Sequence, residues 1–307
     1  MSERMRGVLA PVVTPFRRDL SPDPERFVRH CRWLLDHGCT GLAVFGTNSE
    51  ANSLSVGERK ELLSRLVESG VPANRLVPGT GCCAFPDTVE LTAHAVKLGC
   101  AGVLMLPPFY YKGVPEDGLF RSFAEVIERV GDARLRVYLY HIPPVAQVGI
   151  PIGLIGRLLD AYPRAVAGIK DSSGDWSHTQ AVIKAYALRG FDVFAGSEVF
   201  LLRTLRAGGV GCITAGANVN PHGIGRVYER WQTPEAEALQ ASIDGVRTVL
   251  QAQPSMIPAL KATIAHFAGD PAWLTVRPPL VAQTAEQQAA LVAALQAVGF
   301  EMPGMRG

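Results

Sequence analysis

Short apolar runs alternate with amphipathic segments along most of the chain. The runs fall near residues 7–13, 41–45, 76–80, 102–106, 136–140, 166–169, 192–195 and 211–215. Each run is apolar at successive positions, which is typical of parallel strands that are covered on both faces. The pattern therefore predicts eight strands separated by helices.

The segments between the runs carry helix boundaries. Three capping boxes are expected, each pairing a short polar residue with an acidic or amide residue three positions later: Ser55 with Glu58, Asp87 with Glu90, and Thr284 with Gln287. A Gly-x-x-Gly phrase recurs within 37–46, 98–107 and 207–216, and its first glycine suits the left-handed position that ends a helix. Each phrase therefore indicates a joint between a helix and the following strand.

Eight strand–helix units in succession predict an α/β fold, specifically a (β/α)₈ TIM barrel with a C-terminal helical extension. We expect residues 1–222 to form the barrel core, and residues 223–307 to complete the barrel with helices and extend it. A doubly wound sheet is the alternative architecture. The sequence lacks the Gly-x-Gly-x-x-Gly turn that such a fold carries after an early strand.

Composition mainly excludes classes of protein. The 307 residues carry a formal net charge of +2 without a basic run, so neither a nucleic acid nor a membrane is an expected partner. The start of the chain lacks the apolar core of a signal peptide, and the apolar runs are too short to span a membrane. The six cysteines form no disulfide framework, and no metal-ligand spacing is present. We expect a cytoplasmic protein that needs no metal ion.

The sixth apolar run ends in a lysine. Lys170 follows Ile169 directly, and the ends of barrel strands form the mouth in which catalysis takes place. Burial at this position favours the uncharged amine, which attacks a carbonyl group to form a Schiff base. Two alternatives stay open: an ion pair with Asp171, and a side chain that reaches water at the rim of the barrel.

Other strand ends bring polar side chains to the same rim. Thr47 and Asn48 follow the second run, where backbone N–H groups at a turn could bind a carboxylate; an ordinary polar turn is the alternative. Tyr138 and Tyr140 face the same way by strand alternation, and Tyr140 is nearer the mouth. Tyr140 either relays a proton there or fills the interior of the barrel.

Taken together, these motifs resemble one family. The stretches "GTNSE" (46–50), "PPFYY" (107–111), "YHIP" (140–143) and "GIKDSSGD" (168–175) are similar to motifs of the dihydrodipicolinate synthase / N-acetylneuraminate lyase family, and the similarity covers nearly the whole chain. That family consists of barrel enzymes that join or cleave 2-keto acids, usually pyruvate, through a lysine Schiff base. The resemblance implies a covalent imine and no cofactor.

The resemblance also implies roles for individual residues. Lys170 would form the imine, and Tyr140 would move the proton at the reacting bond. Thr47 and the N–H of Asn48 would bind the carboxylate of the keto acid, and Thr47 would link Tyr140 to a second tyrosine. Tyr110 matches that second tyrosine, which some members insert from a neighbouring subunit. A homotetramer is expected for the same reason.

Further contacts with the substrate are expected at the seventh and eighth strands. The seventh run ends in Gly196, Ser197 and Glu198, and Ile213 lies in the eighth run. The resemblance implies that an acidic residue near Glu198 holds sugar hydroxyl groups. The alternative for Glu198 is a carboxylate in the first turn of a helix, where the helix dipole favours it. Whether Tyr110 or Tyr111 is the second active-site tyrosine stays open.

The second substrate decides the reaction. Synthases of this family carry Y-N-V-P-x-R, whose arginine holds a substrate carboxylate, whereas residues 140–146 contain no arginine. We therefore expect a carbon–carbon lyase that acts on pyruvate or a related 2-keto acid, with a hydroxylated aldehyde or a sugar-acid-derived partner. Three alternatives remain: a sugar-acid dehydratase that uses the same lysine, a true 4-hydroxy-tetrahydrodipicolinate synthase, and a keto-acid-binding relative without turnover.

Overall fold

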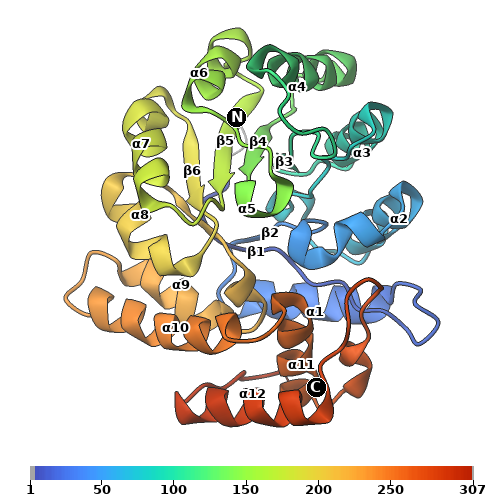
Figure 1. Ribbon diagram of the computed structural model, residues 1–307, viewed down its shortest axis with the longest axis vertical. Helices are drawn as coiled ribbons and strands as arrows, with labels where there is room; N and C mark the ends of the chain where they lie inside the picture. The colour runs from blue at the N-terminus through green and yellow to red at the C-terminus, as the bar shows by residue number, and fades with distance from the viewer. Residues whose placement is uncertain (1–3, 306–307) are drawn as a thin grey trace.

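The computed structural model describes residues 4–305, and these contain seven parallel β-strands. The strands are β1 (Gly7–Ala10), β2 (Gly41–Leu42), β3 (Val103–Met105), β4 (Val137–His141), β5 (Val166–Asp171), β6 (Asp192–Ala195) and β7 (Gly211–Ile213). Their order in the sheet is β2-β1-β7-β6-β5-β4-β3. The strands gather at the centre of the molecule, and helices surround them (Figure 1).

The third apolar run is an extended segment rather than a regular strand. It lies between the two edge strands of the sheet, because the N–H of Val77 donates to the carbonyl of Leu42 in β2 (2.8 Å) and the N–H of Thr80 donates to Leu104 in β3 (3.0 Å). Pro78 has no N–H to donate, so the ladder is interrupted there. The prediction of a regular strand was wrong at this run, yet the segment connects both edges of the sheet.

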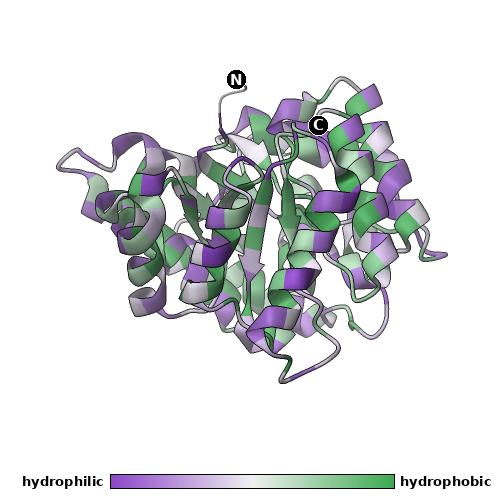
Figure 2. Ribbon diagram, turned by 90° about the horizontal axis from the view of Figure 1, so that it is seen from above, coloured by the Kyte–Doolittle hydropathy of each residue, from purple (hydrophilic) through white to green (hydrophobic). Residues whose placement is uncertain are grey.

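Two apolar layers explain the continuous apolar runs. Side chains such as Leu9, Tyr138 and Phe194 form an inner cluster enclosed by the curled sheet. Their neighbours along the strands, such as Val8 and Val137, belong to a larger cluster between the sheet and the helices. Figure 2 shows apolar residues along the strands and on parts of the surrounding helices. Successive residues of a strand therefore face two different apolar layers, as in a covered parallel sheet.

Twelve α-helices lie within residues 4–305: α1 (Pro24–Asp36), α2 (Val56–Glu68), α3 (Phe85–Lys97), α4 (Glu116–Val130), α5 (Pro143–Ala146), α6 (Ile152–Ala161), α7 (Trp176–Tyr186), α8 (Leu201–Ala207), α9 (Pro221–Arg230), α10 (Ala236–Gln251), α11 (Met256–Ala268) and α12 (Ala285–Ala297). The capping boxes expected at the starts of α2 and α12 are confirmed. The box expected at Asp87 is wrong. Helix α3 already begins at Phe85, with Pro86 in its first turn, so Asp87 lies inside that turn.

The last helices cover one side of the molecule. In Figure 1, α11 lies beside α1, and α12 runs along the outer edge. The division of the chain after residue 222 stays a prediction; that point falls within the first turn of α9. None of the helices formed by the described residues combines the length and the apolar character needed to cross a bilayer.

Candidate active site

A cavity of about 490 Å³ opens at the carboxyl ends of β4, β5 and β6. Its wall combines residues from strand ends, from the turns that follow them, and from α10 and the start of α11: Thr47, Asn48, Tyr140, Ile142, Val145, Lys170, Asp171, Ser172, Gly174, Gly196, Ser197, Val199, Phe200, Ala215, Arg247, Gln251, Ser255, Met256 and Ile257. Tyr140 and Lys170 are register partners on adjacent strands. The parallel sheet therefore brings side chains from distant parts of the chain to one edge.

Lys170 is buried without a counter-ion. Its residue surface is 2% exposed, and its Nζ lies 4.2 Å from the centre of the Tyr140 ring. The amine forms no hydrogen bond or ion pair with any of residues 4–305. The carboxylate of Asp171 is instead used by the N–H of Ser173 and by the side chains of His178 and Thr179. The geometry thus argues against both structural alternatives, the ion pair with Asp171 and the solvent-exposed rim.

Tyr140 and Thr47 meet at the cavity. The hydroxyl groups lie 3.2 Å apart, within hydrogen-bonding distance. Thr47 and Asn48 begin a short 3₁₀ turn, η1 (Thr47–Ser49), whose first N–H groups have no acceptor within the turn. Ser49 faces away from the cavity: it is fully buried, and its hydroxyl accepts the N–H of Gly46 (3.1 Å).

A buried ion pair connects the residue after the η1 turn to α11. Glu50 follows η1 in the left-handed conformation (φ 55°) and pairs with Lys261 of α11. Lys261 also donates to the carbonyl of Thr275 (2.9 Å), and Glu50 accepts the N–H of Arg277 (2.9 Å). Burial lowers the pKa of Lys261 to about 8, and the carboxylate of Glu50 opposes that shift. The turn is thereby tied to α11, a helix more than 200 positions along the chain.

Gly196 and Ser197 directly follow β6. The N–H of Gly196 donates to the carbonyl of Asp171 (2.7 Å). A Cβ at position 196 would lie 2.7 Å from that carbonyl oxygen and 2.0 Å from the hydroxyl of Ser172. Only glycine allows this close approach of the two strand ends. Both residues predicted here are therefore part of the cavity wall.

Glu198 and Ile213 do not line the cavity formed by residues 4–305. Ile213 belongs to the inner apolar cluster. Glu198 is 2% exposed; its carboxylate accepts the hydroxyl of Thr214 and pairs with Arg247 of α10 (Nη1–Oε2 3.1 Å). A direct contact of Glu198 with a substrate does not fit this burial. Glu198 instead orients Arg247, which is itself part of the cavity wall.

Arg247 is the residue that sequence reasoning missed. It lies in the middle of α10, far from every strand end and from every motif. Its side chain is 12% exposed, and its buried Nε has no hydrogen-bond partner in the described part of the chain. Nothing in the local sequence distinguishes this arginine from those on solvated helix faces. Only the packing of α10 over the strand ends brings it to the cavity.

The two loop tyrosines, Tyr110 and Tyr111, are largely exposed to solvent. Tyr110 is 75% exposed and Tyr111 is 70% exposed, and their rings meet edge to face with centres 5.6 Å apart. Neither ring contributes to the cavity wall formed by the described residues. Large aromatic side chains with such exposure are typical of a contact surface.

A histidine cluster lies behind Lys170. His141, Asp171 and His178 have potential ligand atoms within 4.8 Å of one another. The two rings are stacked with centres 4.4 Å apart and planes only 11° apart, so their lone pairs lie in two separate, nearly parallel planes, and Nδ1 of His141 already accepts the N–H of Ile150 (2.9 Å). Burial lowers the pKa of His141 to about 4, and the hydrogen bond to Asp171 raises the pKa of His178. The cluster is better described as a stacked hydrogen-bond network that holds β5 against α7.

The sequence profile of the Dihydrodipicolinate synthetase family matches residues 4–298. The chain belongs to this family. A protein from Chloroflexus aurantiacus named "Uncharacterized DapA-like lyase" is 35% identical over 95% of this chain and 97% of its own length. Among solved structures, the dihydrodipicolinate synthase from Agrobacterium tumefaciens has a TM-score of 0.88 at 32% identity, covering 96% of this chain and 99% of its own. The pyruvate complex of YagE, a family member from E. coli K12, has a TM-score of 0.87 at 26% identity, with the same coverage.

As a member of the dihydrodipicolinate synthetase family, the chain is an aldolase-type lyase. The guanidinium group at the cavity of this chain does not come from the segment after Tyr140. The run after Tyr140 carries no arginine, and Arg247 approaches the cavity from α10 instead. The guanidinium group at the cavity wall therefore comes from a residue outside the strand-end motifs.

Proposed function

We propose that the chain is a (β/α)₈-barrel, class I aldolase-type lyase in which Lys170 forms a Schiff base with pyruvate or a related 2-keto acid. The observation that supports this most strongly is a lysine that is 2% exposed, unpaired within residues 4–305, and part of a cavity wall beside a tyrosine. An amine placed in this way can add to the carbonyl group of a keto acid and form an imine. A family member of similar structure, YagE, has been solved in complex with pyruvate.

The proposed reaction uses three groups. The amine of Lys170 adds to the C2 carbonyl of the keto acid, and water leaves as the imine forms. In the cleavage direction the bond between C3 and C4 breaks, its electron pair moves into the imine, and Tyr140 takes the proton of the C4 hydroxyl as the aldehyde leaves. Tyr140, held by the hydroxyl of Thr47 at 3.2 Å, returns this proton to C3 of the resulting enamine, and water then hydrolyses the imine to release pyruvate and the Lys170 amine. The N–H groups at the start of η1 hold the carboxylate. The imine is the electron sink, so the proposal includes neither a metal ion nor a cofactor.

Incubation with pyruvate and borohydride tests this function directly. Reduction converts an imine into a stable amine, so we expect a pyruvyl-sized increase in intact mass that maps to the peptide containing Lys170. A folded protein that gains no mass with pyruvate or with longer 2-keto acids would contradict the proposal. Such a result would favour a binding protein without turnover.

The partner substrate of this proposal is an aldehyde, hydroxylated or derived from a sugar acid. Arg247 provides a guanidinium group at the cavity, held by the buried carboxylate of Glu198. Guanidinium groups bind carboxylates through directed, charge-assisted hydrogen bonds. The segment after Tyr140 contains no arginine that could form them. We therefore assign Arg247 to the anionic or hydroxylated end of the partner, and Glu198 to positioning Arg247.

Replacing Arg247 by glutamine is expected to change the choice of aldehyde and leave the imine intact. Loss of a charge-assisted contact should lower kcat/KM by about 10–100-fold for an aldehyde that bears a carboxylate, such as succinic semialdehyde. The neutral analogue butanal should be affected by less than about 3-fold, and trapping of pyruvate should be unchanged. Equal losses for both aldehydes would assign Arg247 a structural role only.

A dehydratase would use the same residues. In that alternative the imine on Lys170 assists the loss of water from a keto-deoxy sugar acid instead of the loss of an aldehyde. Product analysis separates the two reactions, because a dehydratase releases no pyruvate from its substrate. The same product analysis, with pyruvate and an aldehyde as substrates, tests the synthase reaction.

The proposed location of the enzyme is the cytoplasm, in line with six cysteines that form no disulfide framework.

The proposed assembly is a homotetramer in which the loop tyrosines reach a neighbouring subunit. Tyr110 and Tyr111 are exposed aromatic side chains on the same rim as the cavity, which fits a subunit contact. We expect sedimentation at micromolar concentration to give the mass of four chains. Replacing both tyrosines by serine should shift the protein to smaller species. A single-chain mass for the unmodified protein would contradict the assembly.

A further inference from the structure

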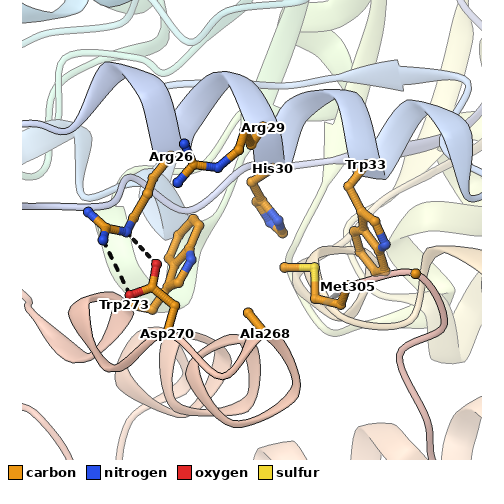
Figure 3. A pocket seen from close by; sticks show the side chains of 9 residues that line it. Arg26, Arg29, His30, Trp33, Ala268, Asp270, Trp273 and Met305 are labelled. Carbon is orange, nitrogen blue, oxygen red and sulfur yellow. Dashed lines mark hydrogen bonds and ion pairs between the residues drawn. The ribbon is translucent and has the colours of Figure 1, made fainter. Parts of the chain in front are cut away.

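A second cavity, of about 210 Å³, lies between α1 and the C-terminal part of the chain. Its wall comes from α1, from the segment where α11 ends and the short helix η7 (Pro271–Leu274) begins, and from residues near the C-terminus: Arg26, Arg29, His30, Trp33, Ala268, Asp270, Trp273, Gly304 and Met305. None of these residues belongs to the wall of the candidate active site. Figure 3 shows the side chains of α1 and of the opposite segment facing one another across this space.

His30 is a buried polar side chain without a partner. The residue is 2% exposed, and neither ring nitrogen has a hydrogen bond within the described part of the chain. The side chain of Asn218 lies close enough to raise the pKa of His30 slightly, but it accepts the N–H of Val13 and donates to the carbonyls of Pro11 and Ala215, and it forms no hydrogen bond of acceptable geometry with the ring. Burial lowers the pKa of His30 to about 4, so the ring is neutral near pH 7. Buried polar groups without a partner are rare because they destabilise the fold, and such a group indicates a missing partner.

Unbalanced positive charge lies at one end of the cavity. Arg26 is neutralised, because its Nε and Nη2 donate to the two carboxylate oxygens of Asp270 (2.6 and 3.3 Å) and it also pairs with Asp23. Arg29 forms no ion pair or hydrogen bond with residues 4–305. Both guanidinium groups lie on the same side of His30 (Figure 3). Arg29 is exposed, and its charge helps to lower the pKa of Asp270 without contacting it, so its guanidinium group can still bind an anion at this end.

The rest of the cavity is aromatic and held in place. The ring of Trp273 packs edge to face on His30, with centres 5.1 Å apart. Trp33 donates its indole N–H to the carbonyl of Pro303 (3.1 Å) and stacks on His37. Met305 lies below His30 and Trp33, between the two side chains (Figure 3). These contacts fix the orientation of both indole rings, so the aromatic walls are formed before any ligand enters.

We propose that this cavity binds a small aromatic carboxylic acid. The carboxylate pairs with Arg29 and accepts the N–H of the neutral His30 ring, and the aromatic ring packs among Trp273, Trp33 and Met305. The volume is below that of sites for drug-sized ligands, which limits the ligand to one or two fused rings. A water molecule would satisfy His30 but would use neither the charge of Arg29 nor the two indole walls.

Binding of benzoate to the full chain tests the proposal. Two of the four tryptophans of the chain line the cavity, so the tryptophan fluorescence should change on titration with benzoate. Calorimetry with benzoate and with indole-3-carboxylate gives the affinities without optical interference. Benzamide, which has the shape of benzoate without its charge, should bind at least about tenfold more weakly. If neither acid binds up to millimolar concentration, the proposal is wrong and the cavity holds only water.

Matched variants locate the binding. Arg29→Gln should weaken benzoate by at least about tenfold and leave benzamide unchanged. Arg32→Gln, three positions further along α1 and outside the wall of this cavity, and Arg247→Gln, in the other cavity, should both bind benzoate as the unmodified protein does. Circular dichroism shows that each variant is folded. Benzoate affinity that is unchanged in Arg29→Gln, or lost in Arg247→Gln, would overturn the proposal.

Discussion

Replacement of Lys170 by methionine is expected to abolish the pyruvate adduct and to lower turnover by at least about 10⁴-fold, because no other group in the cavity supplies a nucleophilic amine. Methionine keeps the length of the side chain and its contact with the Tyr140 ring, so the fold should survive. The adduct is measured by intact mass after reduction with borohydride. Turnover is measured as release of pyruvate from a keto-acid substrate, or as its consumption with an aldehyde.

Two further variants make this result specific. Tyr140→Phe removes the proton relay but not the amine; it should still trap pyruvate while turnover falls by about 10²–10⁴-fold. Lys184→Met changes an exposed lysine of α7 and should behave as the unmodified protein. If Lys170→Met still gained the adduct, another amine would be the nucleophile. If Tyr140→Phe retained full turnover, the proton would move through a different group.

Replacement of the other buried lysine, Lys261, is expected to act on stability instead of chemistry. Lys261 is fully buried and paired with Glu50, so Lys261→Met leaves a buried carboxylate that has lost its counter-ion. Loss of one partner of a buried pair lowers the free energy of unfolding by about 3–5 kcal/mol. Urea denaturation followed by circular dichroism, at one fixed protein concentration, measures this loss.

The double variant shows whether the uncompensated charge is the cause. Glu50→Gln added to Lys261→Met removes the charge from the remaining partner, and we expect it to recover part of the lost stability. Where the Lys261→Met protein is folded, it should still trap pyruvate on Lys170. A loss of stability below about 1 kcal/mol would mean that water compensates Glu50 and that the pair contributes little.

The two lysines illustrate how far the sequence carries. Lys170 could be singled out because it ends a continuous apolar run in a chain whose pattern predicts a barrel, where strand ends form the mouth. Lys261 lies within a helix, and no local pattern marks it as buried. Its partner Glu50 is more than 200 residues away in the sequence. Pairing of this kind follows from helix packing, which local periodicity does not describe.

The fold could be predicted in outline because the spacing of apolar residues and the residue types at turns are properties of short stretches of sequence. Continuous apolar runs and capping boxes identified the strands and the starts of α2 and α12. The failures were also local in origin. Pro78 interrupts the ladder of the third run, and Pro86 moves the start of α3 ahead of its expected cap. In both cases a proline backbone constraint overrode the side-chain pattern.

The sequence by itself determined the class of fold, the family and the strand ends that carry the cavity residues Lys170, Tyr140, Thr47 and Gly196. These residues could be placed because the carboxyl ends of parallel strands lie at the same edge of the sheet. Tertiary structure alone decided three further points. Glu198 does not line the cavity, Arg247 reaches the cavity from α10, and His30 faces a second cavity lined in part by Gly304 and Met305. The reason is the same in each case. Which face of a helix meets a strand end, or another helix, depends on how distant elements pack, and residues on a helix carry no local signal of that choice.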